Sequence, residues 1–180
     1  MYEEEDYSEK ITYRRFPIVP IERRMGAFAI DFIVVFFVSS FFGQAGSWLV
    51  FLLGWSIMRI VVVDRNQGQS LGYYAMDMKV IDYRYSRVPD LVTLAKREGT
   101  LGFAAMLASL GLQSFSNGLL LLFLATPLLV DCLLALFDEQ LDRAFHDRIA
   151  KTIVIQTQRG FSLDLRLKKL LATIQRNMRQ

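Results

Sequence analysis

The sequence predicts an all-α membrane protein in which four transmembrane helices form two hairpins. Three observations support this fold class: two 39-residue stretches almost without charge, a short polar turn near the middle of each, and a chain that is 53% hydrophobic. The first stretch, residues 25–63, contains Asp31 and Arg59 as its charged residues, and the second, residues 99–137, contains Asp131. Because a helix of about 20 apolar residues crosses a bilayer core, each stretch is long enough for two spans.

We expect the four spans at residues 25–42, 46–63, 99–114 and 117–137. The third has a short apolar run that directly follows three charged residues at 96–98, so two arrangements stay open. It is either a thin span from about Gly99, preceded by an interfacial helix over residues 91–98, or a re-entrant helix. Its many small residues allow close helix packing within a bilayer, which favours a central position.

The segments outside the spans have patterns of their own. Residues 78–83 and 152–156 predict short strands, which gives a small cytoplasmic β element. Residues 1–22 are acidic, and we expect a flexible cytoplasmic segment there. Residues 157–180 predict a basic amphipathic helix, which suits either anionic lipid headgroups or packing on the protein's own cytoplasmic side.

The distribution of Lys and Arg predicts the orientation in the membrane. Residues 1–24 carry five, residues 64–98 carry six and residues 138–180 carry nine, whereas the two turns within the hairpins carry none. By the positive-inside rule, both termini and the central loop face the cytoplasm. The chain is therefore expected to be a multi-pass integral membrane protein.

Several function classes are disfavoured by composition. Nucleic-acid binding is disfavoured because the sequence has no basic stripe with interleaved aromatic residues. Cys132 and His146 are the sole residues of their types, so no Cys/His cluster indicates a metal. His146 is expected to cap a helix or anchor a loop, because it lacks further ligands nearby. We expect no catalytic residues, no cofactor and no enzymatic activity.

The charges inside the spans are the candidate site. Asp31 and Asp131 each lie six residues from the cytoplasmic end of their stretch, about 9 Å deep at ~1.5 Å per residue. Arg59 returns to the depth of Asp31 in the second helix. Isolated charges at this depth are unfavourable, so the three should face inward and pair with one another. Arg24 lies two turns before Asp31 on the same helix face, and its long side chain can reach the cluster.

Two interpretations of this cluster stay open. The same residues at the same depths can form a buried ion pair that locks the hairpins together, or an ion or proton site. Pro127, four residues before Asp131, leaves the carbonyl of Phe123 without its helical partner. Broken helices of this kind occur at transporter ion sites, but proline also occurs in spanning helices for structural reasons.

Three segments carry a resemblance to a known family. Residues 23–31 read RRMGAFAID, residues 68–72 with 78–82 read GQSLG and MKVID, and residues 145–155 read FHDRIAKTIVI. In this order they resemble the RDD family of small integral membrane proteins, named for one arginine and two aspartates. The resemblance implies an RDD-like membrane domain over residues 23–156.

On that resemblance, the family's named residues are Arg24, Asp31 and Asp147. Lys151 stands where a glycine is expected. The family has no settled biochemical activity, although transport, including cation/proton exchange, has been attached to some members. The resemblance therefore implies fold and topology more than function.

Two function classes follow. The first is a non-enzymatic membrane accessory protein: a scaffold, an assembly factor or a subunit of a larger membrane complex. The second is a small oligomeric cation or proton-coupled transporter that uses Asp31, Asp131 and Arg59. The expected partners are the lipid bilayer, anionic headgroups at the C-terminal helix, and either another membrane protein or further copies of the chain.

Overall fold

A computed structural model of the chain describes residues 19–137 and 143–157, with a few isolated positions up to residue 174. Most of the expected acidic segment and most of the expected C-terminal helix lie outside the described residues. The end of the acidic segment, predicted as flexible, is helical instead, because α2 begins at Ile21. The described chain is mostly helical. Its helices and strands, in chain order, are α2 (Ile21–Ser40), α3 (Gly43–Ser56), the π-helical turn η1 (Ile57–Val61), α4 (Val62–Arg65), α5 (Leu71–Ala75), β1 (Met78–Asp82), α6 (Leu91–Gln113), α7 (Gly118–Leu136), α8 (Phe145–Ala150) and β2 (Thr152–Gln156).

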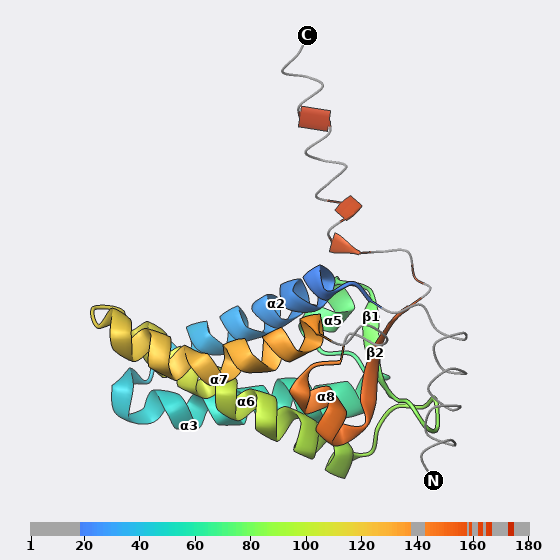
Figure 1. Ribbon diagram of the computed structural model, residues 1–180, viewed down its shortest axis with the longest axis horizontal. Coiled ribbons are helices and arrows are strands. Elements are labelled where there is room, and N and C mark those ends of the chain that lie inside the picture. The colour runs from blue at the N-terminus through green and yellow to red at the C-terminus, as the bar shows by residue number, and fades with distance from the viewer. Residues whose placement is uncertain are drawn as a thin grey trace.

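The long helices lie side by side in an elongated bundle, and α5, α8 and the two strands gather at one end of it (Figure 1). We call this end the charged end and the opposite end the apolar end. α2 packs against α3, and α6 packs against α7, which gives two helical hairpins. By length and composition, two described helical segments are able to cross a membrane: Ala45–Arg65 and Gly118–Ala135.

α6 differs from its prediction. It is one uninterrupted helix that begins at Leu91, so residues 91–98 do not form a separate interfacial helix. The reason is burial: Leu94, Arg97, Glu98 and Leu101 follow one another at helical spacing, and all four are buried. The charged residues at 97 and 98 therefore continue the inward face of the helix.

The small residues of α6 let it pack centrally, as the sequence predicts. α6 contacts α3, α7, α8 and η1. A Cβ atom placed on Gly102 would lie 2.5 Å from the Trp55 ring, so only glycine lets α3 approach this closely. Trp55 in turn stacks on Phe51, and both rings are buried.

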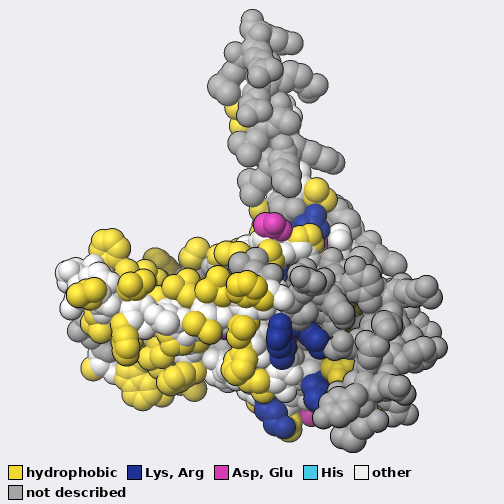
Figure 2. Space-filling model, viewed as in Figure 1, with side chains coloured by type: hydrophobic (Ala, Val, Ile, Leu, Met, Phe, Trp, Pro, Cys, Tyr) yellow, Lys and Arg dark blue, Asp and Glu magenta, His cyan; other side chains and the backbone are white. Residues whose placement is uncertain are grey.

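The outer surface divides along the bundle. Hydrophobic side chains gather over the apolar end, and Lys and Arg side chains lie where the bundle meets the charged end (Figure 2). On α7, Leu119 is 82% exposed and Phe123 is 75% exposed. A soluble helical bundle would bury such a face, so this surface suits lipid or another apolar partner.

The two strands form an antiparallel sheet across the charged end. Met78 pairs with Gln156 and Asp82 pairs with Thr152. These strands match the predicted segments, except that β1 ends one residue earlier, at Asp82. The sheet and α5 connect the loop between the hairpins to the segment after α7, which brings α8 onto α6.

Candidate functional site

Asp31 of α2 and Arg59 of η1 form a buried ion pair at the charged end. Arg59 Nη1 donates to Asp31 Oδ2 over 2.8 Å, and both side chains are buried. The depth argument from the sequence predicts this pair. Arg59 lies in the π-helical turn, a local widening of the helix that is found often at functional sites.

The loop before α5 completes the bonding of Asp31. The Ser70 hydroxyl donates to Oδ2 over 2.6 Å, and the Gly72 N–H donates to Oδ1 over 2.7 Å. A Cβ atom on residue 72 would lie 2.0 Å from the carbonyl oxygen of Ala27 in α2. Glycine at this position is therefore what allows the backbone to reach the carboxylate.

Arg59 extends the contact to α6. Its Nε donates to Glu98 Oε2 over 3.1 Å, and Arg97 also donates to Glu98. Arg97 Nε then donates to Asp147 Oδ1 over 2.9 Å, and Arg24 donates to the other oxygen of Asp147.

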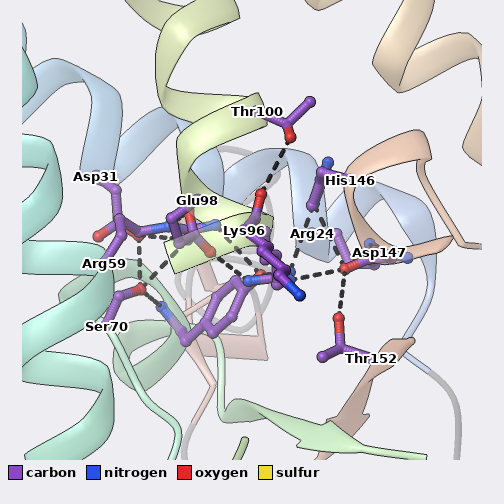
Figure 3. A network of polar contacts seen from close by, with 12 residues as sticks. Arg24, Asp31, Arg59, Ser70, Lys96, Glu98, Thr100, His146, Asp147 and Thr152 are labelled. Carbon is purple, nitrogen blue, oxygen red and sulfur yellow. Dashed lines mark hydrogen bonds and ion pairs between the residues drawn. The ribbon is translucent and has the colours of Figure 1, made fainter. Parts of the chain in front are cut away.

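The result is a chain of six charged residues that alternate in sign, which we call the charge network (Figure 3). Its three acids and three arginines balance to zero formal charge. Its members, in order of contact, are Asp31, Arg59, Glu98, Arg97, Asp147 and Arg24.

Tyr73 of α5 lies between the two central arginines. The Arg59 guanidinium stands 4.6 Å from the centre of its ring, and Arg97 Nη2 donates to its hydroxyl over 2.7 Å. The ring offers a π face and the hydroxyl offers an acceptor, so one residue satisfies both cations. Five elements, α2, η1, α5, α6 and α8, thus meet at the network.

Asp131 does not join Asp31, contrary to the prediction from matched depth. Asp131 Oδ1 instead accepts from the His146 backbone N–H over 3.0 Å, and its Oδ2 lies 2.7 Å from His146 Nδ1. The physical reason is direction: α7 packs against α6 and α8, so its inward face near residue 131 meets the start of α8. The sequence suggests a capping or loop-anchoring role for His146, and in the structure His146 joins the start of α8 to α7 through Asp131.

Asp147 joins α8 to both the network and the sheet. The Thr152 hydroxyl at the start of β2 lies 3.5 Å from Asp147 Oδ1. Burial alone raises the pKa of the Asp147 carboxyl, but Arg24, His146 and Arg97 outweigh burial and hold the pKa well below its usual value. Asp147 is therefore a fixed negative charge that ties the sheet to the helices.

Of the residues predicted to cluster, Arg24, Asp31 and Arg59 lie in the network. Asp147, which the family resemblance names without a predicted contact, also lies there, and Arg97 and Glu98 were not predicted as members. The sequence pattern predicts both at the interfacial start of the third span. A signal was present in the helical spacing, because both follow Leu94 and precede Leu101 by three or four residues. Within the described part of the chain, no group of three or more His, Cys, Asp or Glu side chains is arranged to hold a metal ion.

Comparison with known protein families covers the whole charge network. The model of the RDD family matches residues 18–151, which covers all members of the charge network. No curated protein and no solved structure matches the chain. The family is generally membrane-associated, in agreement with the two apolar helices. With most of its length matched, the chain belongs to the RDD family.

Proposed function

We propose that this chain is a four-span integral membrane protein with both termini and the small sheet on the cytoplasmic side. The distribution of Lys and Arg supports this orientation. α2 and α6 have 20 and 23 residues. At ~1.5 Å per residue they are about 30 and 35 Å long, enough to cross a bilayer beside the other two helices.

The charges in α2 and α6 are compatible with spanning because they are paired inside the protein. Asp31, Arg97 and Glu98 are each at most 1% exposed. Ionisable residues in membrane proteins are tolerated when they face the interior and bond to one another. The basic residues of segment 157–180, expected as an amphipathic helix, would add contacts to anionic lipid headgroups.

Within that membrane, we infer a non-enzymatic accessory role: a scaffold, an assembly factor or a subunit of a larger membrane complex. The observation that carries this inference is the neutral, internally bonded charge network. An ion site needs a carboxylate with free acceptor capacity, whereas Asp31 accepts from Arg59, Ser70 and Gly72. The network therefore favours a lock that holds the two hairpins and the sheet in one arrangement.

A second function, cation or proton-coupled transport, has one observation in its favour. Asp131 lies outside the neutral network and bonds to His146, and both residues border a cavity between α2 and α7. A carboxylate and an imidazole in contact can hold or release a proton. In this alternative, Asp131 belongs to the transport site, and Asp31 and Arg59 also take part in transport.

One experiment separates the two functions. The tagged chain is extracted in a mild detergent, and its assembly is resolved by native electrophoresis and mass spectrometry. We expect a complex of fixed stoichiometry with a different membrane protein. A tagged four-span protein of similar size, purified in the same way, controls for non-specific capture.

The same purified chain is then reconstituted in proteoliposomes for flux of sodium, potassium and protons. We expect no flux in either direction. A homo-oligomer with flux that Asp131→Asn abolishes would overturn the accessory role in favour of transport. Asp64→Asn, a change of the same kind at an exposed position, is the matched control.

A further inference from the structure

A cavity of 330 Å³ lies between α2 and α7 at the charged end. Its walls are built from apolar side chains such as Phe28 and Ala29 of α2 and Leu128 of α7. Arg24, Asp131 and His146 also line it. The volume lies within the range of small-molecule sites, which are mostly apolar with a few polar groups.

The cavity is open to the side of the bundle. Met25 and Leu129 both line it, and they are 57% and 49% exposed on the outer surface of α2 and α7. In the proposed orientation this surface faces the bilayer. A ligand can therefore enter from the membrane, chain first, without crossing the charge network.

We propose that this cavity binds one acyl chain of an anionic phospholipid of the adjacent leaflet. The chain lies along Phe28, Ala29 and Leu128, and the phosphate-bearing headgroup lies at the charged end beside Arg24. The inference rests on the proposed accessory function, because the transport alternative places Asp131, its candidate ion-site residue, at the border of the same cavity.

Two features select an anionic headgroup. Arg24 is the most accessible member of the charge network, with 10% of its side chain exposed, against at most 2% for the others. A guanidinium has five donors in a planar fork, so it binds a phosphate while it keeps its contact with Asp147.

The apolar walls select a chain rather than a free phosphate. Burial of methylene groups supplies the binding energy in such a site, and a headgroup without a chain lacks it. The position of the polar groups at one end of the cavity matches an amphiphile whose headgroup stays at the membrane surface.

The test is lipid retention by the purified full-length chain in dodecyl maltoside, measured by native mass spectrometry. The probes are dioleoyl phosphatidylglycerol and dioleoyl phosphatidylcholine, which share their chains and differ in charge. We expect one bound lipid, with phosphatidylglycerol preferred about fivefold because of its negative charge. Glycerol phosphate, which offers a phosphate without chains, is expected not to displace it.

Ala29→Trp fills the cavity from its exposed wall and should lower occupancy about tenfold, because the chain loses its buried contacts. Leu129→Trp tests the opposite wall and serves if the first variant does not fold. Ile33→Trp, on the same helix but 61% exposed and outside the cavity, is the matched control. Thermal stability and size-exclusion profile verify that each variant is folded.

Several results would overturn the proposal. They are equal occupancy in wild type and in a folded Ala29→Trp or Leu129→Trp variant, equal retention of the two lipids, and displacement by glycerol phosphate. A loss of binding in Ile33→Trp equal to that in Ala29→Trp would also contradict it, because the lipid would then bind the general apolar surface.

Discussion

The surroundings of Asp31 and of Asp131 differ, although the two aspartates share residue type and predicted depth. Asp31 is enclosed: Arg59, Ser70 and Gly72 donate to it, and its side chain has no exposed surface. Asp131 is bonded by His146 in the described part of the chain, is 6% exposed and borders the cavity between α2 and α7. The first region fixes the fold, and the second is where a ligand can approach.

The comparison shows that the number of donors around a buried charge, more than its depth, separates a structural charge from an accessible one. A carboxylate such as Asp31, with three of its about four acceptor sites taken by its own chain, has little capacity left for an ion. A carboxylate with a single side-chain partner next to a cavity keeps that capacity. Each prediction below alters one of these two regions and asks whether the difference persists.

The largest effect is expected from Arg97→Leu, at the centre of the enclosed region. Arg97 is fully buried and bonds Glu98, Asp147 and the Tyr73 hydroxyl, so its loss leaves buried negative charge uncompensated. We expect a loss of about 3 to 5 kcal/mol in unfolding free energy, measured by denaturation in mixed micelles. Lys96→Leu, at the exposed neighbouring position, is the control and should change little. Equal effects of the two changes would show that the network does not hold the fold.

Gly72→Ala should be the next largest. The new Cβ would meet the Ala27 carbonyl oxygen at 2.0 Å, which pushes α5 away from α2 and weakens the bond to Asp31. We expect a loss of about 1 to 3 kcal/mol, as for other overpacked sites. Gly99→Ala in α6 is the matched control because no atom lies within 4 Å of its new Cβ. There the change should be neutral or stabilising, by up to about 1 kcal/mol. A Gly72→Ala variant as stable as Gly99→Ala would argue against the close approach.

Asp131→Asn should have a smaller effect than Asp31→Asn. The substituted side chain still accepts the His146 backbone N–H through its oxygen, so it loses mainly the contact with the ring nitrogen. We expect about 1 kcal/mol for Asp131→Asn, the usual net contribution of one hydrogen bond. Thermal unfolding of both variants in the same detergent measures the difference. A larger loss for Asp131→Asn would reverse the roles of the two regions.

Acidification should have the smallest effect over the neutral range. The pKa of Asp147 lies below its ordinary value of 3.8, so its stabilising contribution is present above that value and is lost as the pH falls below it. Between about pH 7 and about pH 5, this group should therefore add no pH dependence. Melting curves at decreasing pH measure the effect, with Asp147→Asn as the comparison. If wild type and Asp147→Asn lose stability equally below pH 3.8, the depressed pKa is not coupled to folding.

The fold and part of the site could be predicted from the sequence because charge scarcity and depth act along the chain. These patterns predict the hairpins and the Asp31–Arg59 pair, and the residue types of segments 78–83 and 152–156 predict the two strands. Counting residues gives the depth of a side chain along its helix but not the direction in which it points around the helix axis. Depth alone therefore predicts Asp131 beside Asp31, whereas in the structure Asp131 faces α8. Arg97 and Glu98 were missed because their burial depends on α8 and α5, which come from distant parts of the sequence.

The central claim is that the pair between Asp31 and Arg59 locks the two helices of the first hairpin to each other. A double-mutant cycle with Asp31→Asn, Arg59→Leu and the combined variant tests it most directly, with unfolding free energies measured in one detergent. Asp31→Asn leaves Arg59 with Glu98 in place of two acidic partners, and Arg59→Leu leaves Asp31 without its cation. The combined variant should therefore be more stable than the sum of the two losses predicts, by about 1 to 3 kcal/mol. Simple additivity of the two losses would contradict the lock.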